Sequence, residues 1–373
     1  MQTLIADRIF DGEEFHMRVP VTINDGRIVA LDTVKGSDEV RLQGTLVPGF
    51  IDVQVNGGGG ALFNDSPNVD TLIQMFSAHA QYGATGFLPT LITDELAVMR
   101  AAANAVAYAL SENISGVLGI HFEGPHLAPA KRGVHTTNYI REISDDEMEL
   151  YARRDIGVRH ITVAPETVPP GIITKLVDMG VIVSLGHSNA NYEIVVEALA
   201  AGATGFTHLY NAMSPFQGRS PGMVGAALLD KDSWCALILD GHHVHPAAAM
   251  LATEVKPQGK MLLVTDAMSL VGTSEQDFEL LGAKIAREGD KLIGPEGQLA
   301  GSMLDMASAV RNAVAMLGIS AGEALRMASR YPAEYLSVAD TAGSIKPGML
   351  ADLVLLDENL NVRSTWVKGT QVF

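Results

Sequence analysis

One cysteine and a shortage of basic side chains set the first limits on what this sequence of 373 residues can be. Cys235 has no second cysteine with which to form an internal disulfide, and the opening residues lack the basic-then-apolar order of a signal peptide. We therefore expect a cytoplasmic protein. Lys and Arg total 26 against 43 Asp and Glu, which gives a formal net charge of −17. No basic cluster interrupts that surplus, so nucleic acid and anionic membranes are unfavourable partners.

Long apolar runs are also lacking, since no stretch offers the ~20 apolar residues that span a bilayer. The composition is 47% hydrophobic and 18% charged, with 37 glycines, which excludes a disordered or coiled-coil chain. Because a domain usually has roughly 100–200 residues, the length allows one large α/β barrel or two ordinary domains.

Both ends of the chain have the pattern of short strands. In the first 48 residues, β-rich runs flank Asp25-Gly26, a pair typical of a tight hairpin. Similar runs occur near the other end, at Leu353–Leu356 and Ser364–Val367. We predict that residues 1–48 and 343–373 form one small β-sandwich domain, and that residues 49–342 form a separate barrel domain.

Between the two ends, eight strand-like segments mostly alternate with helical ones. The expected strands are Gly49–Val55, Gly86–Leu91, Val117–Glu123, His160–Ala164, Val181–His187, Gly205–Leu209, Cys235–Asp240 and Met261–Asp266. This alternation predicts an α/β fold, a TIM-like (β/α)8 barrel, for which roughly 250 residues is typical. An open doubly wound sheet is the alternative, but no strand–GxGxxG–helix motif occurs early in the chain. After the eighth strand, Ala283–Ala286 and Lys291–Ile293 predict a hairpin.

Histidines and carboxylates gather where the expected strands end. Glu123 ends the third strand, and His187 and His208 follow the fifth and sixth. In a parallel barrel these ends share one rim, where active sites are built. Two histidines and a carboxylate are a common zinc set that leaves a position open for water. Structural hydrogen bonding or a buried ion pair is the alternative explanation for these residues.

Asp266 closes the apolar run at the end of the eighth strand. A carboxylate there could take a proton from a metal-activated water and return it to a leaving amine. The alternative is an aspartate that caps the next loop.

Seven segments together carry a specific resemblance. They are Pro48–Gly57, Phe122–Pro125, Lys131–His135, Ser184–Ser188, Thr207–Met213, Asp240–His243 and Val264–Ala267. In this order, and with the β-rich ends, they resemble the N-acetylglucosamine-6-phosphate deacetylase family of metal-dependent amidohydrolases. The resemblance implies hydrolysis of N-acetyl-D-glucosamine 6-phosphate to D-glucosamine 6-phosphate and acetate.

The resemblance also implies roles for individual residues. Glu123, His187 and His208 would hold the catalytic metal, Asp266 would be the general base and acid, and His135 would polarise the acetyl carbonyl. The implied substrate-binding residues are Val134, His135, Asn211, Ala212, Arg219, Asp240, His243, Leu299, Ala300 and Gly301. Arg219 would reach the phosphate bound in a neighbouring subunit, which implies a homodimer. A surface arginine and a solvated loop histidine are the plainer explanations of Arg219 and His135.

The first strand ends in Gln54-Val55-Asn56, where many amidohydrolases have His-x-His, and the fourth expected strand has no lysine to bridge two metals. An amide is a poorer ligand than imidazole, so we expect one divalent ion, with Gln54 near the metal's water. Zn²⁺ suits the ligands best, although Fe²⁺, Mn²⁺ and Co²⁺ can occupy similar sites. His126 departs from the family pattern, and both a role in sugar selectivity and a packing role are open.

Two other functions are alternatives. One is deacetylation of another hexosamine phosphate, such as N-acetylgalactosamine 6-phosphate, because these motifs specify acetamide chemistry better than the orientation of a hydroxyl. The other is a non-catalytic barrel that binds a sugar phosphate. Such a barrel would have no need of Glu123, His187, His208 and Asp266 together, so the enzyme is favoured.

Overall fold

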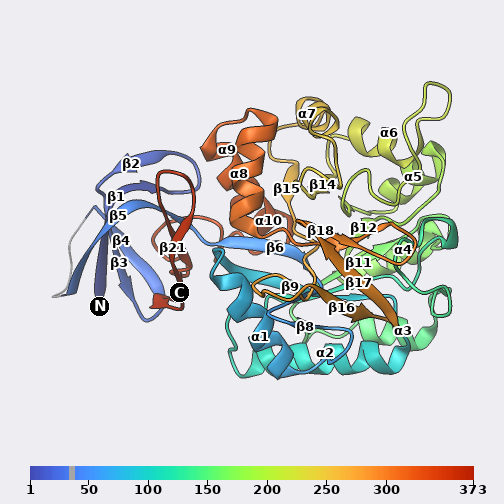
Figure 1. Ribbon diagram of the computed structural model, residues 1–373, viewed down its shortest axis with the longest axis horizontal. Helices are drawn as coiled ribbons and strands as arrows, with labels where there is room; N and C mark the ends of the chain where they lie inside the picture. Colours follow the sequence, from blue (N-terminus) through green and yellow to red (C-terminus); the bar gives the residue numbers. More distant parts are fainter. Residues whose placement is uncertain (33–37) are drawn as a thin grey trace.

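The protein consists of a small β domain beside a larger barrel, and both chain termini lie in the small domain (Figure 1). The structure is a computed structural model and describes residues 1–32 and 38–373. Among the helices of these residues, none is long and apolar enough to cross a membrane.

One mixed sheet built from both chain ends forms the small domain. Its strands are β1 (Gln2–Phe10), β2 (Phe15–Met17), β3 (Pro20–Asn24), β4 (Arg27–Leu31), β5 (Asp38–Pro48), β20 (Leu353–Leu356), β21 (Val362–Val367) and β22 (Thr370–Gln371). The predicted hairpin joins β3 to β4, and its turn residues Asp25 and Gly26 have φ of 48° and 76°. Positive φ at both positions is what a two-residue type I′ turn requires.

The pairing of β5 with β20 holds the two ends together, with Leu46 opposite Leu355 in an antiparallel ladder. Buried side chains including Leu4, Ile28 and Trp366 form the core of this domain, separate from the main core. The domain limits expected from the sequence, 1–48 with 343–373 and 49–342, stay predictions.

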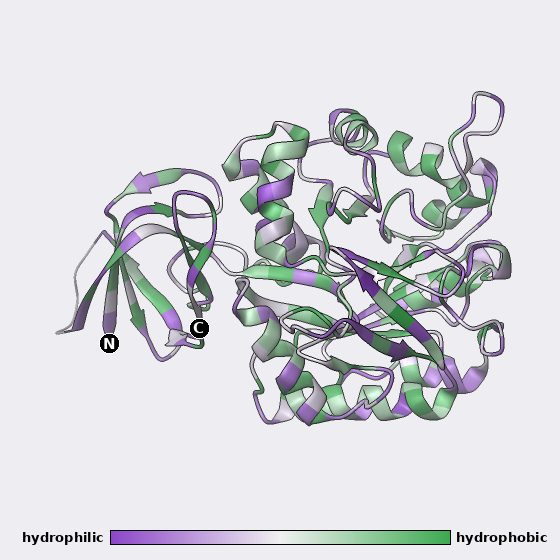
Figure 2. Ribbon diagram, in the orientation of Figure 1, coloured by the Kyte–Doolittle hydropathy of each residue, from purple (hydrophilic) through white to green (hydrophobic). Residues whose placement is uncertain are grey.

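The barrel contains all eight predicted strands in sequence order, each parallel to its neighbour. They are β6 (Phe50–Val55), β9 (Ala84–Ile92), β10 (Gly119–Glu123), β11 (Val158–Val163), β12 (Ile182–Leu185), β13 (Gly205–Phe206), β14 (Trp234–Leu237) and β15 (Met261–Leu263). Most of their residues are buried, because side chains fill the inside and helices cover the outside. The TIM-like fold is therefore confirmed, and Figure 2 shows β6 entering it as a mostly hydrophobic strand.

Helices connect the strands and close the chain around the barrel. They are α1 (Val69–Ala80), α2 (Leu96–Ser111), the 3-10 turn η1 (Pro129–Lys131), α3 (Asp145–Tyr151), α4 (Pro170–Asp178), α5 (Tyr192–Ala200), α6 (Gly222–Leu229), α7 (Pro246–Val255), α8 (Met306–Leu317), α9 (Ala321–Ala328) and α10 (Arg330–Tyr335). Local sequence explains several starts: Asn68, Asn191 and Asp305 accept hydrogen bonds from the first turn of the helix that each precedes. Helices α6 and α7 follow the sixth and seventh strands of the barrel.

The last gap in the barrel, between β15 and β6, is closed at the rim. In the described residues these two strands share no regular ladder. Instead the backbone N–H of Asp266 donates to Gln54 O at 3.0 Å, and that of Asn56 donates to Ala267 O at 2.9 Å. We call this junction the seam. It brings the end of the first strand directly against Asp266.

A four-stranded antiparallel sheet follows the barrel and extends the predicted hairpin. Its strands are β16 (Asp277–Leu280), β17 (Ala283–Glu288), β18 (Lys291–Ile293) and β19 (Leu299–Ser302). Its apolar face packs with Ile92 and Met268 in a small core of its own. A two-stranded hairpin, β7 (Gly57–Gly58) with β8 (Ala61–Leu62), follows the seam.

Candidate active site and metal centre

A cavity of about 160 Å³ opens at the carboxyl ends of the barrel strands. The predicted residues that line it are Glu123, Val134, His135, His187, His208, Asn211, Ala212, His243, Asp266, Leu299 and Gly301. These residues come from segments spread over most of the barrel sequence. Parallel strands place their ends at one rim, and that is what brings the residues together.

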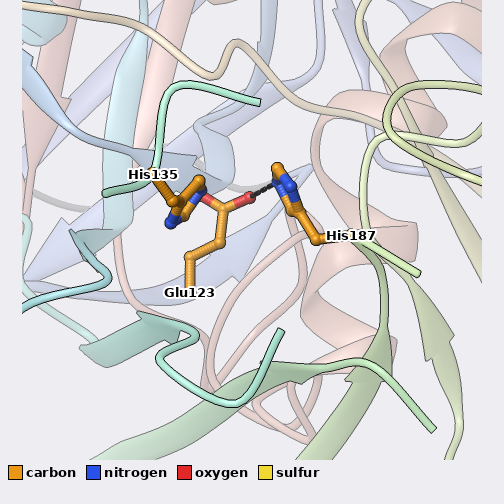
Figure 3. A group of neighbouring side chains, drawn as sticks. All are labelled: Glu123, His135 and His187. Carbon is orange, nitrogen blue, oxygen red and sulfur yellow. Dashed lines mark hydrogen bonds and ion pairs between the residues drawn. The ribbon is translucent and has the colours of Figure 1, made fainter. Parts of the chain in front are cut away.

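Three donor atoms converge on one side of the cavity. Glu123 Oε1 lies 3.1 Å from His187 Nε2 and 2.9 Å from His208 Nε2, and the two imidazole nitrogens are 3.1 Å apart. His135 lies beside Glu123, and the ligand atoms of Glu123, His135 and His187 are all within 4.8 Å of one another. Figure 3 shows Glu123 and His187 directed toward each other, with His135 beside them.

The hydrogen bonds behind this cluster indicate what it can hold. His187 Nδ1 donates to the carbonyl of Lys131 at 2.8 Å, so in the neutral ring Nε2 carries a lone pair. That lone pair faces Glu123 Oε1, which is also an acceptor. Two acceptors about 3 Å apart need a cation or a proton between them. The donor set therefore fits a divalent metal ion.

Burial and hydrogen bonding act in opposite directions on Glu123. Burial raises the pKa of its carboxyl, but when the imidazole nitrogens that face it are protonated, the hydrogen bonds from His187 and His208 outweigh burial and hold the pKa well below the usual range. Gln54 Nε2 donates to the other carboxylate oxygen at 3.1 Å. Glu123 is therefore an anion, as a metal ligand must be.

Strained backbone accompanies the site. His187, His208 and Asp266 have φ of 46°, 35° and 53°, in the left-handed region that non-glycine residues rarely occupy. Each such residue costs on the order of 1–3 kcal/mol and persists only where the surroundings fix it. The surroundings thus hold these three side chains at a conformational cost.

Asp266 faces the metal cluster across the seam. Its Oδ1 accepts hydrogen bonds from Asn56 Nδ2 at 2.6 Å and Gln54 Nε2 at 3.2 Å. Its Oδ2 has no protein partner in the described part of the chain. Burial and the charge of Glu123 raise the pKa of Asp266 to about 6. One oxygen is thus fixed, and the other can exchange a proton near neutral pH.

His135 supplies a neutral hydrogen-bond donor. His135 Nδ1 lies 2.8 Å from the Thr93 hydroxyl and 3.3 Å from the Thr93 backbone nitrogen; because the backbone N–H can only donate, we assign Nδ1 as the acceptor and the ring proton to Nε2. Burial lowers the pKa of His135 to about 3, with the charge of His187 acting in the same direction. The ring is neutral at pH 7, and its Nε2–H can stabilise an oxygen that gains negative charge.

On the sugar-facing side, two of the predicted residues do not line the cavity. Asp240 lies behind His243, whose Nδ1 is 2.6 Å from Asp240 Oδ2, so it orients that histidine. Ala300 points into the core, because strand β19 alternates its faces and presents Leu299 and Gly301 to the cavity instead. Gly301 is required there: its φ is 65°, and a Cβ would lie 2.4 Å from Met268 Cγ.

Three further residues lie outside the cavity. Gln54 is buried beneath it and bridges Glu123 and Asp266. Arg219 is exposed on a hairpin-like loop, where Gln217 and Ser220 exchange backbone hydrogen bonds of 3.0 Å. His126 is fully buried and contacts the Arg141 carbonyl and the Tyr151 hydroxyl, both at 2.9 Å. It does not line the cavity, which favours the packing role over a direct contact with the sugar.

Four cavity residues were not predicted: Asn56, Ile92, Gly133 and Met268. Asn56 could have been found, because it stands two residues after Gln54 and a strand directs such residues to the same face. Met268 follows Asp266 by the same spacing. Ile92 ends an apolar strand and gives no signal in the sequence that separates it from core.

A TIM-like barrel with a carboxylate and two imidazoles converging at its rim, opposite an aspartate, defines the class of metal-dependent hydrolases. The sequence model of the amidohydrolase family matches residues 45–372, and this chain belongs to that family. The enzyme and the metal dependence expected from the sequence are confirmed at this level.

Three proteins that are similar to this chain over most of their length are deacetylases of hexosamine phosphates. A curated protein of Shewanella sp. (strain ANA-3), an N-acetylgalactosamine-6-phosphate deacetylase, is 48% identical over 360 residues, covering 95% of this chain and 91% of its own. An N-acetylglucosamine-6-phosphate deacetylase of Haemophilus influenzae is 36% identical and covers 90% and 88%. The crystal structure of N-acetylglucosamine-6-phosphate deacetylase from Pasteurella multocida matches with a TM-score of 0.95 at 36% identity, over 99% of both chains.

Proposed function

We propose that this protein hydrolyses N-acetyl-D-glucosamine 6-phosphate to D-glucosamine 6-phosphate and acetate. The observation that carries this proposal is the convergence of Glu123, His187 and His208 in a cavity that Asp266 also lines. The relatives named above act on hexosamine phosphates that carry an acetamide, which supports the same substrate class here.

Glu123, His187 and His208 are the residues that would hold one divalent ion, with Gln54 beside its water. When bound, this ion polarises the acetamide carbonyl and makes water more acidic. Imidazole and carboxylate donors favour Zn²⁺, with Fe²⁺, Mn²⁺ and Co²⁺ as the other candidates. Elemental analysis of protein purified without added metal tests both the number and the kind of ion.

Two side chains act on the substrate. His135 donates its Nε2–H to the carbonyl oxygen and stabilises the charge that develops there. Asp266 takes a proton from the attacking water at Oδ2 and then gives it to the departing sugar nitrogen. Asn56 and Gln54 keep Oδ1 fixed throughout, so the same oxygen serves both steps.

The phosphate needs a cation that the chain's own cavity does not supply, since no lysine or arginine is among the described residues that line it. We infer that Arg219, exposed on its loop, reaches the substrate of a neighbouring subunit in a homodimer. Light scattering gives the oligomeric state. Mixing an Arg219→Ala chain with an Asp266→Asn chain tests the sharing, because mixed dimers would regain one complete site.

N-acetylgalactosamine 6-phosphate is a second candidate substrate, favoured by the 48% identical Shewanella relative. The two sugars differ only in the orientation of one hydroxyl. Acetate release measured with each sugar at equal enzyme concentration gives two values of kcat/KM, and the larger value identifies the substrate. Failure to release acetate from either would refute the proposed function.

The domain limits, 1–48 with 343–373 and 49–342, are part of the same proposal and are supported by the β5–β20 pairing. A cytoplasmic location is proposed from the single cysteine. Fractionation of cells that express the protein tests the location.

A further inference from the structure

Asp52 is a fully buried carboxylate for which the proposed reaction has no use. It lies in the middle of β6 with 0% of its surface exposed. No ion pair to it occurs among the described residues. Its partners are three donors: the backbone N–H of Gln54 at 3.2 Å, the backbone N–H of Thr265 at 3.3 Å and the Thr265 hydroxyl at 2.5 Å. A buried charge without a cation is expensive, so its presence requires an explanation.

Two of these three hydrogen bonds cross the seam of the barrel. Asp52 belongs to the first strand and Thr265 directly precedes Asp266 at the end of the last. Elsewhere in the barrel, neighbouring strands are held by regular ladders, but here the described residues show none. The Asp52 carboxylate therefore takes the place of ladder hydrogen bonds at the level just below the cavity.

Thr265 passes this constraint on to Asp266. Its hydroxyl oxygen also accepts the backbone N–H of Ala267 at 3.2 Å. This hydrogen bond links the two residues that flank Asp266 in the chain. Ser302 Oγ donates to the Thr265 carbonyl at 2.6 Å. Asp266 itself has a φ of 53°, a conformation that it keeps only while these neighbours are fixed.

We propose that Asp52 is a positioning residue for hydrolysis: its carboxylate fastens Thr265 across the seam and thereby sets the backbone from which Asp266 projects. Gln54 is held by the same carboxylate, through its backbone N–H, so both groups that face the reaction from the seam share one anchor. This inference rests on the proposed function in taking Asp266 as the group that carries the proton.

The test compares Asp52→Ala, Asp52→Asn and Thr265→Val as metal-loaded proteins. Misplacement of a reacting group by about 1 Å can cost about 100-fold, so we expect kcat of Asp52→Ala and Thr265→Val to fall about 100-fold. KM should stay within about threefold of wild type, because the sugar contacts are untouched. Metal content per chain should be unchanged. Asp52→Asn should keep at least about tenfold more kcat than Asp52→Ala, since its amide oxygen still accepts the Thr265 N–H.

The double variant Asp52→Asn/Thr265→Val adds a second criterion. Residues that act through one contact are not additive, so the double variant should lose no more kcat than Thr265→Val alone. Additive losses would overturn the proposal.

Thr365→Val is the matched control. Thr365 is a fully buried threonine whose hydroxyl donates to the Ala80 carbonyl at 2.7 Å, far from the cavity. It should lose stability and keep kcat. If Asp52→Ala and Thr265→Val keep kcat within about threefold of wild type, or lose kcat only in proportion to lost metal or lost folded protein, Asp52 has no positioning role.

Crystal structures of wild type and Thr265→Val separate this inference from the proposed function. If wild type releases no acetate from either sugar phosphate, the proposed function fails. A displaced Asp266 carboxylate in the variant would still support the anchor, and an unmoved one would refute it. Thr265→Val is nearly isosteric, so it remains informative if Asp52→Ala does not fold.

Discussion

The Asp52→Asn variant should gain stability relative to wild type as the pH rises, even though the substitution slows the reaction. Burial raises the pKa of Asp52 from an ordinary 3.8 to about 7, against the opposing effect of the hydrogen bonds from Thr265 and Gln54. The folded protein therefore holds a proton on Asp52 at a pH where the unfolded chain has lost it. Asparagine carries no such proton equilibrium.

The sign and size follow from the two pKa values. Below about pH 4, Asp52 is protonated in both states and contributes no penalty. From about pH 4 to about pH 7 the unfolded chain has released this proton while the folded protein keeps it, so wild type loses stability at about 1.4 kcal/mol per pH unit, on the order of 4 kcal/mol in total, and the loss levels off above pH 7. Between pH 5 and pH 8 the loss is about 3 kcal/mol. With an unfolding entropy of about 2.1 cal/mol/K per residue, this corresponds to about 4 °C in Tm for a chain of this length.

Differential scanning calorimetry of the metal-loaded proteins at several pH values measures the effect as a difference between variant and wild type. The contributions of all other groups are common to both proteins and cancel. Hydrogen bonds weakened by the substitution shift the difference equally at every pH, so the prediction concerns its slope. A Tm difference that is constant from pH 5 to pH 8 would refute the reasoning.

Asp352→Asn is the control for this experiment. Asp352 lies in the small domain, accepts the Lys368 backbone N–H at 2.7 Å, and has a pKa raised by burial to about 6. The stability advantage of Asp352→Asn over wild type should stop growing about one pH unit lower than that of Asp52→Asn, and kcat should not change.

Three further predictions concern the reaction. Asp266→Asn should keep its metal and lose about 10²–10⁴ in kcat, because the amide cannot take the proton; wild-type turnover would remove Asp266 from this role. His135→Gln should lower kcat by about 10²–10³ with a small change in KM, as expected for a lost donor to a developing oxyanion, and a raised KM with unchanged kcat would indicate a binding role only. Arg219→Ala should raise KM about tenfold or more, the size of a lost charge-assisted hydrogen bond; an unchanged KM would show that Arg219 does not contact the phosphate.

Much of the fold could be predicted because its signals are local. Apolar segments of strand length separated by helical ones predicted all eight barrel strands, and Asp25-Gly26 predicted the first hairpin. The two long-range features, barrel closure and the pairing of the chain ends, followed from the strand count and from the similar pattern of both ends. The extension of the Ala283–Ile293 hairpin to four strands did not follow, because Asp277–Leu280 and Leu299–Ser302 are short and partly exposed.

For the site, the sequence by itself determined which residue types stand at the strand ends, since strand ends are local features. Only the tertiary structure decided that Glu123 and His208, 85 residues apart, meet at 2.9 Å. It also decided the proton positions on His135 and His187, which depend on partners from other loops. Asp52 reads in the sequence as one polar residue in an apolar strand. Its role as an anchor depends on the meeting of the first and last strands, because its hydrogen-bond partner Thr265 is 213 residues away in the sequence.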